Sequence, residues 1–270
     1  MVISLNKLDL TDGLGRSLMI VTVCALLISF GNASGTEAKS SPKTDAPRLS
    51  QTEIKTSLQL ARAASAAGDL STAIGLYRKI ARSGADPAIQ VEFGDTLVRG
   101  GMIDDAIGAY QAVDPRSKAE VGALLGLQMA YTRLDEPRKA LEYAQRAVSL
   151  APQSERAQVG LGVALDTVGR HTEAQGCYRL ALAIAPRSVA ARNDLALSLA
   201  FTGQFPEAVE ILTPMARSAN ASPRLRQNLA LIYGLDGDRD QAMALSRADL
   251  DAPAAEANLR FFDFARAHAK

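Results

Sequence analysis

Apolar and polar residues are distributed along this chain in blocks that repeat the same arrangement. In residues 155–186, apolar and small residues occupy one face of a helix up to Gly169 and one face of a second helix up to Pro186. A glycine between two such blocks favours the end of a helix, because glycine adopts a positive φ at little cost. The block therefore predicts two helices joined by a tight turn, and similar blocks precede and follow it.

An alanine in the second predicted helix marks the repeat most clearly. Its successive positions are 33 residues apart once and 34 residues apart four times: Ala73, Ala106, Ala140, Ala174, Ala208 and Ala242. The turn residue has the same period, as Gly68, Gly101, Asp135, Gly169, Gly203 and Gly237. A large apolar or aromatic residue follows the alanine by four positions at Tyr77, Tyr110, Tyr178 and Leu212. Such a fixed period predicts a repeat array in which the alanines lie where two helices approach most closely.

These offsets resemble the tetratricopeptide repeat, a helix-turn-helix unit of about 34 residues. The resemblance implies an all-α fold, a right-handed superhelical solenoid of about six repeats with a C-terminal capping helix. No stretch alternates with period two for long enough to predict a sheet. We expect an array over residues 50–252, with repeats at about 54–86, 87–120, 121–154, 155–188, 189–222 and 223–252, and the capping helix at 253–270.

Polar residues at the predicted helix starts support this division. Ser50 and Glu53 have the spacing of a capping box, in which each side chain accepts a hydrogen bond from the other residue's backbone N–H. The other predicted N-caps are Asp86, Ser117, Ser154, Ser188 and Ser222. Pro87 and Pro223 follow two of them at the first helical position, where a missing N–H costs little.

The last predicted helix is expected to cover the open end of the array, because the final unit of a solenoid otherwise exposes its apolar face. Leu259, Phe262 and Ala265, or their immediate neighbours, are expected to point inward. Phe261 and Phe264 share a different face of the helix from Phe262, so the three rings cannot all be buried together.

The first 35 residues do not belong to the array and are expected to be a signal peptide or an N-terminal anchor. Lys7 and Arg16 precede an uncharged apolar run at residues 18–30. This run of 13 residues is shorter than the roughly 20 that a membrane-spanning helix needs, and it has the length of a secretory apolar core. Cleavage is expected after Gly35, followed by a polar, flexible linker over residues 36–49.

Two cysteines bear on membrane attachment and redox chemistry. Cys24 lies inside the apolar run and is followed by further apolar residues, which is a poor match to a lipoprotein signal. An outer-membrane lipoprotein remains the alternative to a cleaved, soluble form. Once residues 1–35 are removed, Cys177 is the only thiol, so no intramolecular disulfide is expected.

The composition indicates neither a nucleic-acid partner nor a catalytic site. The 30 basic residues nearly balance 29 acidic ones, so no strong positive field favours nucleic acid. His171 is placed in a turn as a solvated residue and His268 in the tail, with no further ligand expected beside either. We therefore expect no metal, no cofactor and no enzymatic activity, and association with a membrane only through the N-terminus, if at all.

The first helix of each predicted repeat carries apolar residues that the tetratricopeptide resemblance places in a groove for a partner peptide. The predicted groove residues are Val91, Leu125, Met129, Val159, Val163, Leu197, Phe201, Leu231 and Leu235, with Val98 beside them. A basic rim is predicted at Arg62, Arg99, Arg133, Arg156, Arg192 and Arg224. Such a surface fits an amphipathic helix or an extended apolar peptide with acidic flanks. The alternative is that the apolar residues face neighbouring helices as core.

The C-terminal third carries a more specific resemblance. The segments SPRLRQNLALIYGLDGD and ANLRFF resemble the end of the TadD family, tetratricopeptide proteins of the bacterial tight-adherence (Flp) pilus assembly system. The resemblance implies an exported, non-enzymatic accessory factor in the periplasm or envelope, whose partners are pilus or envelope assembly components. A general periplasmic adaptor or chaperone for envelope proteins is the alternative function.

Overall fold

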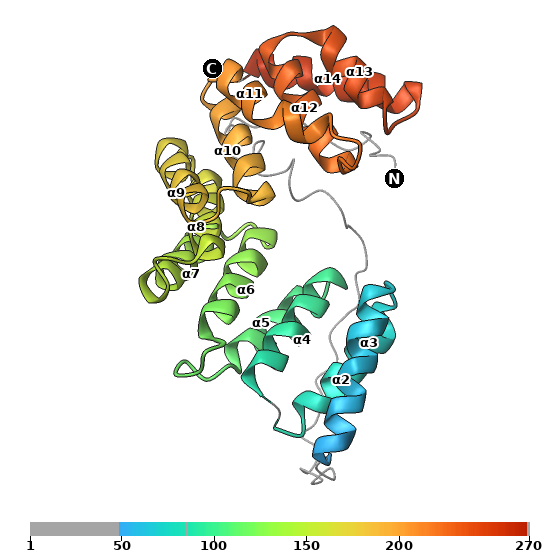
Figure 1. Cartoon of the computed structure of the whole chain (residues 1–270), viewed down its shortest axis with the longest axis vertical. Helices are drawn as coiled ribbons and strands as arrows, with labels where there is room; N and C mark the ends of the chain where they lie inside the picture. Colours follow the sequence, from blue (N-terminus) through green and yellow to red (C-terminus); the bar gives the residue numbers. More distant parts are fainter. Residues whose placement is uncertain (1–48, 85, 269–270) are drawn as a thin grey trace, which may run out of the picture. The chain divides into compact units, whose positions relative to one another are not determined.

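The computed structural model describes residues 49–84 and 86–268, and all of its regular elements there are helices (Figure 1). The helices of the first three repeats are α2 (Gln51–Ala66), α3 (Leu70–Ala81), α4 (Pro87–Arg99), α5 (Ile103–Gln111), α6 (Glu120–Arg133) and α7 (Pro137–Leu150). Those of the next three are α8 (Glu155–Thr167), α9 (His171–Ile184), α10 (Val189–Phe201), α11 (Phe205–Ala216), α12 (Pro223–Asp236) and α13 (Arg239–Arg247). The last helix is α14 (Ala252–His268). Six helical pairs and a terminal helix confirm the predicted fold class.

The described residues form two compact units that divide between Ala151 and Pro152. The N-terminal unit contains α2 to α7, and the C-terminal unit contains α8 to α14. Within each unit, the second helix of one pair packs against the first helix of the next, as α3 does on α4 and α9 on α10. The predicted signal or anchor at 1–35, and the linker at 36–49 except for its last residue, lie outside the described residues.

The turn inside every pair has the same left-handed backbone. Gly68, Gly101, Gly169, Gly203 and Gly237 all have positive φ, between 76° and 100°. Asp135 occupies the same place in the third pair with φ 56°, and it is the only non-glycine residue with positive φ among the described ones. Aspartate tolerates this region better than most side chains, which explains how the third turn keeps its geometry without glycine.

The predicted N-caps are present with one exception. The Ser50 hydroxyl accepts from the Glu53 N–H, and the Glu53 carboxylate accepts from the Ser50 N–H, so the capping box is complete. Side-chain caps are also present at Asp86, Ser154, Ser188 and Ser222. The prediction of Ser117 is wrong, because the Asp114 side chain accepts from the Arg116 N–H in a further turn that precedes α6. The cap residue of α6 is therefore Ala119, which has no side-chain cap.

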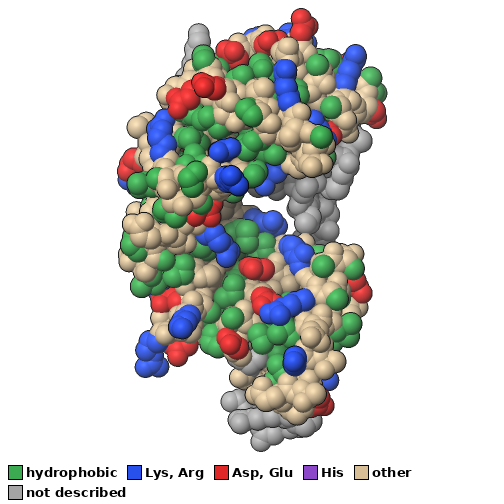
Figure 2. All heavy atoms as spheres, viewed as in Figure 1, with side chains coloured by type: hydrophobic (Ala, Val, Ile, Leu, Met, Phe, Trp, Pro, Cys, Tyr) green, Lys and Arg blue, Asp and Glu red, His purple; other side chains and the backbone are tan. Residues whose placement is uncertain are grey.

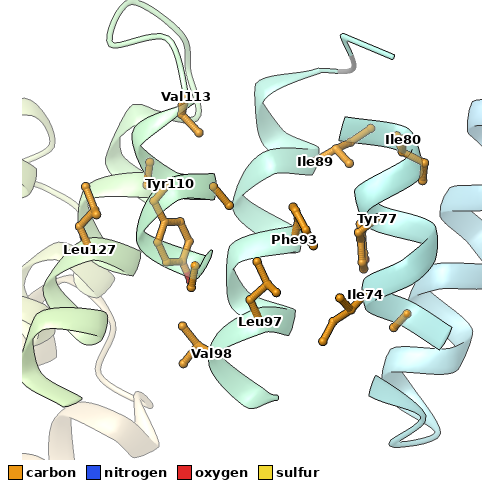
Figure 3. Close-up of a cluster of buried hydrophobic side chains, with 14 of the residues drawn as sticks. Ile74, Tyr77, Ile80, Ile89, Phe93, Leu97, Val98, Tyr110, Val113 and Leu127 are labelled. Atoms are coloured by element: carbon orange, nitrogen blue, oxygen red, sulfur yellow. The ribbon is translucent and has the colours of Figure 1, made fainter. Parts of the chain in front are cut away.

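The small residues of the repeat lie at helix contacts. The six periodic alanines are all 0% exposed, which leaves no room for a larger side chain without displacing a neighbour. In the N-terminal unit, the Tyr110 ring lies between α4 and α6, beside Phe93, Leu97 and Leu127 (Figure 3). A Cβ on Gly94 would lie 2.4 Å from the ring, and one on Gly126 would lie 2.3 Å from it. Tyr110 can therefore occupy this place only because both flanking helices have a glycine there.

The terminal helix covers the end of the C-terminal unit. Leu259 and Phe262 are buried as predicted, and the third buried residue is Ala255 rather than Ala265. These three residues lie four and three positions apart on one face of α14, which packs against α12 and α13. Phe261 and Phe264 are partly exposed, so only one of the three phenylalanines is buried.

Candidate functional site

The candidate site is the surface formed by the first helices of the pairs, which we call the first-helix face. It comprises α2, α4 and α6 in the N-terminal unit, and α8, α10 and α12 in the C-terminal unit. All nine predicted groove residues lie on these helices, and eight of them are partly exposed. Leu231 is only 5% exposed, because Phe262 and Leu259 of α14 pack in the same cluster. Val98 is 1% exposed, so both residues belong to the core and not to an accessible groove.

In the C-terminal unit the remaining groove residues form an apolar stripe that is half-buried. Val163 and Leu197 are 34 residues apart on α8 and α10, and Phe201 and Leu235 have the same separation on α10 and α12. Leu197 and Leu235 pack against the buried cluster around Phe262. The stripe therefore rests on the core but still presents apolar atoms to solvent on α8, α10 and α12.

In the N-terminal unit the same face is interrupted by charge. Figure 2 shows blue and red side chains among the hydrophobic ones over the part of the chain from α2 to α6. Arg62 binds Glu92 with two hydrogen bonds of 2.8 and 2.6 Å, and Tyr77 donates a third to Glu92 at 3.0 Å. The Arg62 guanidinium lowers the pKa of Glu92 through these hydrogen bonds. Burial, together with the bond to Glu92, raises the pKa of Tyr77 to about 12.

The predicted basic rim is only partly available to a partner. Arg62 is neutralised by Glu92, and Arg192 donates to the Pro186 carbonyl at 2.6 Å. Arg99 and Arg133 donate to the backbone carbonyls of Ser65 and Val98, respectively, at 3.1 and 3.2 Å. Four of the six rim arginines thus form hydrogen bonds within the protein. Their repeat positions in the sequence did not predict these bonds.

Asp166 organises a polar cluster between α8, α9 and α10. Its carboxylate is bonded to His171 Nδ1 at 2.8 Å, accepts from Tyr178 at 2.9 Å and accepts from Ser198 at 2.8 Å. The His171 ring also lies 5.9 Å from that of Phe201 in the apolar stripe. The prediction of His171 as a solvated turn residue is wrong, because its side chain is only 15% exposed and is held by the carboxylate of Asp166. Because two of these partners lie on α9 and the third on α10, the cluster links the fourth and fifth repeats.

A second cluster of polar side chains in the C-terminal unit contains Asp194, whose carboxylate is costly to ionise. Burial raises the pKa of Asp194, although Asn193 donates to the Asp194 carboxylate at 2.8 Å. Asn228 of α12 in turn donates to the Asn193 amide oxygen at 2.7 Å. Nearby charges act in both directions, since Arg224 favours ionisation and Asp166 opposes it.

Replacing Asp194 with asparagine is therefore expected to stabilise the C-terminal unit at neutral pH. A folded-state pKa above the unfolded value means that stability is greatest below the unfolded pKa and is lost as pH rises through the folded pKa. Urea denaturation followed by circular dichroism should give a higher free energy of unfolding for Asp194→Asn than for the wild type at pH 7. The difference should shrink as pH falls towards about 4. Glu210→Gln, on the exposed side of α11, is the control and should leave the pH profile unchanged. A destabilised Asp194→Asn protein at pH 7 would contradict this account.

Neither a metal cluster nor a membrane-spanning helix occurs in the described part of the chain. Within residues 49–84 and 86–268, no group of three or more His, Cys, Asp or Glu side chains is arranged to hold a metal ion. No helix of these residues is both long and apolar enough to cross a bilayer.

Comparison with known proteins agrees with the repeat geometry. The model of the tetratricopeptide repeat family matches residues 58–120 and 129–189. Residues 58–120 and 129–189 therefore carry tetratricopeptide repeats. No curated protein gives a significant match to the sequence.

Solved structures of tetratricopeptide repeat proteins share the fold. A tetratricopeptide repeat protein from Parabacteroides merdae is 18% identical, with a TM-score of 0.60 over 81% of this chain and 90% of that one. TTC0263, a thermophilic tetratricopeptide protein of Thermus thermophilus, is 20% identical, with a TM-score of 0.59 over 66% of this chain and 98% of that one. The Cut9–Hcn1 complex of the anaphase-promoting complex gives a TM-score of 0.66 at 17% identity, over 79% of this chain and 44% of the matched chain. Tetratricopeptide repeat proteins bind protein partners and are in general non-enzymatic scaffolds, so this fold is that of a protein-interaction scaffold.

The carboxylates of the first helices that bind tyrosines of the second helices were not identified from the sequence. Tyrosine at the fourth position after the periodic alanine is part of the repeat, but its hydroxyl partners are not periodic. Tyr77 donates to a carboxylate 15 residues later, Tyr110 to one 15 residues earlier, and Tyr178 to one 12 residues earlier. Because no common spacing links donor and acceptor, only the packed helices reveal these pairs.

Proposed function

We propose that this protein is an exported accessory scaffold of tight-adherence (Flp) pilus assembly and that its first-helix face binds a segment of an assembly component. The specific role rests on the resemblance of SPRLRQNLALIYGLDGD and ANLRFF to the TadD family. The export rests on the short apolar run and the small residues that follow it. A general periplasmic adaptor for envelope proteins is the competing assignment.

The observation that carries the binding role is the apolar stripe of the C-terminal unit. Val163, Leu197, Phe201 and Leu235 are partly exposed although each belongs to a helix whose other faces are packed. The four residues occupy two repeat positions, Val163 with Leu197 and Phe201 with Leu235, and together they form a strip across α8, α10 and α12. Isolated exposed apolar residues, by contrast, are common on any surface. A strip of this kind gains free energy when another apolar surface covers it.

Changing Val163 and Phe201 together to aspartate is expected to abolish capture of the partner and to prevent surface piliation. Two carboxylates in the stripe would have to be desolvated on binding, which opposes association. The measurement is complementation of cells that lack the gene, with pili counted by electron microscopy and bound proteins identified after cross-linking of the envelope. Circular dichroism of the purified variant should show near-wild-type helicity.

The matched control introduces two aspartates on a second helix instead of on the first-helix face. Leu180 and Ile184 of α9 are 56% and 38% exposed and lie on a second helix, so Leu180→Asp with Ile184→Asp should leave piliation intact. A folded Val163→Asp, Phe201→Asp protein that still supports pili would refute the proposed mechanism. Loss of capture of diverse envelope proteins, with normal piliation, would instead favour the general adaptor. Mass spectrometry of the protein from the same envelopes tests export, since an intact Met1 would contradict cleavage after Gly35.

A further inference from the structure

We propose that Arg99 and Arg133 form a two-point binding site for an acidic protein segment, at the end of the first-helix face in the N-terminal unit. The site would take two carboxylates of Asp or Glu side chains, one at each guanidinium. This inference rests on the proposed protein-binding role of the first-helix face, but it concerns a different unit from the apolar stripe.

The two arginines have equivalent places in successive repeats. Arg99 is the last residue of α4, and Arg133 is the last residue of α6. Arg99 Nη1 donates to the Ser65 carbonyl in the last turn of α2, and its Nη2 donates to the Ser65 hydroxyl. Arg133 Nη1 donates in the same way to the Val98 carbonyl in the last turn of α4. Each guanidinium therefore lies against the carbonyl end of the preceding first helix, where the helix dipole favours a cation.

These contacts fix the arginines but do not neutralise them. Among residues 49–84 and 86–268, neither guanidinium forms an ion pair, whereas Arg62 on the same face is paired with Glu92. Asp95 of α4 is a nearby carboxylate, and its Oδ1 accepts from Tyr110 at 2.7 Å. Both arginines are exposed, and each guanidinium has five N–H donors. The bonds to Ser65 use two of these donors on Arg99, and the bond to Val98 uses one on Arg133.

A pair of anchored cations fits carboxylates better than other ligands. Guanidinium binds a carboxylate with parallel hydrogen bonds, and an arginine that is already held loses little conformational entropy on binding. Neighbouring helices pack about 8–10 Å apart, so the two guanidinium groups repeat at roughly that distance. An extended chain advances about 3.3 Å per residue and alternates its side chains between two faces, so acidic side chains two positions apart share one face at about 6.6 Å, and their flexible stems can reach both guanidinium groups. The expected partner segment therefore carries Glu or Asp at positions i and i+2.

The test uses the whole protein and a defined peptide, N-acetyl-Glu-Ala-Glu-amide. Titration followed by NMR of the arginine Nε–H groups should shift the Arg99 and Arg133 signals in a saturable manner. The glutamine analogue, N-acetyl-Gln-Ala-Gln-amide, should cause no shift, and 0.5 M salt should largely remove the effect of the acidic peptide because ions screen exposed charges. Equal shifts with both peptides, or shifts confined to other arginines, would overturn the inference.

Substitutions of Arg99 and Arg133 distinguish the effect of the positive charge from the effect of the guanidinium hydrogen bonds. Arg99→Gln and Arg133→Gln should each weaken peptide binding by about three- to fivefold, the size of one exposed ion pair. Lysine at either position keeps the charge and should retain part of the affinity. Arg138→Gln, at an exposed arginine on the second helix α7, should bind like the wild type. If a glutamine variant unfolds, the shifts of the wild-type arginines still decide the question.

The outcome is independent of the pilus assignment. Val163→Asp with Phe201→Asp alters only the C-terminal unit and should leave peptide binding unchanged. Failure of the peptide to bind, with piliation still dependent on the apolar stripe, would remove this inference and keep the proposed function. If the peptide binds but the protein proves unnecessary for pili, the proposed function would be removed and this inference kept.

Discussion

Phe262→Ala is expected to destabilise the C-terminal unit by about 3–5 kcal/mol, the usual cost of removing a buried phenylalanine ring. Phe262 is 5% exposed and packs in one cluster with Leu231 and Leu259. Its ring lies over Gly234 of α12, where a Cβ would be 2.4 Å from a ring carbon. Truncation would leave a cavity that the glycine beneath it cannot fill. Urea denaturation followed by circular dichroism measures the loss.

The matched control is Phe264→Ala on the same helix. Phe264 is partly exposed and stacks on the His268 ring at 4.1 Å, near the end of the described chain. Its removal should cost well under half of what Phe262→Ala costs, because much of the ring already contacts water. Similar losses for the two variants would show that α14 does not cover the unit through the face containing Phe262.

Gly126→Ala is expected to destabilise the N-terminal unit by about 1–3 kcal/mol through overpacking. The new methyl group would lie 2.3 Å from the Tyr110 ring, which is 1% exposed and cannot move into solvent. Gly94 supports the opposite side of the same ring, so displacement in that direction is also blocked. The midpoint of urea denaturation should fall although alanine is the better helix former.

Gly108→Ala provides the control in the same unit. Gly108 lies within α5, and a Cβ there would meet nothing within 4 Å. This substitution should raise stability by up to about 1 kcal/mol, since alanine reduces the backbone entropy lost on folding. Opposite signs for two chemically identical changes would establish that the contact with Tyr110, and not helix propensity, decides the effect. An unchanged or raised midpoint for Gly126→Ala would contradict the packing.

The two units present different first-helix faces, which has a consequence for partner recognition. In the N-terminal unit the face carries ion pairs and anchored arginines, as in Arg62 with Glu92 and in Arg99 on Ser65. In the C-terminal unit the corresponding places hold Val163, Leu197 and Phe201. Contacts with the first face should weaken with added salt, whereas those with the second should not. Salt dependence of binding can therefore assign a partner segment to one unit or the other.

The sequence by itself determined the helices, their pairing and the turns between them. These features depend on interactions within a few residues: a serine caps the helix that follows it, and a left-handed turn needs a residue that tolerates positive φ. The contact that each periodic alanine makes within its pair is also local, because the two helices of a pair are joined by a short turn. The same reasoning failed at Ser117, where the Asp114 side chain forms a competing turn before the helix begins.

Only the tertiary structure decided what the side chains of the face do. Arg99 and Arg133 reach carbonyls 34 and 35 residues away, Ser198 reaches Asp166 over 32 residues, and Leu231 is covered by residues of α14. The three polar partners come from the preceding repeat, and the cover over Leu231 comes from the terminal helix. Side chains of the same type have different partners in different repeats. The helical period fixes which way a residue points along its own helix, but it does not fix which polar group the neighbouring helix places opposite. Whether an arginine is a free cation, or a leucine part of a groove, therefore depends on contacts that no local pattern specifies.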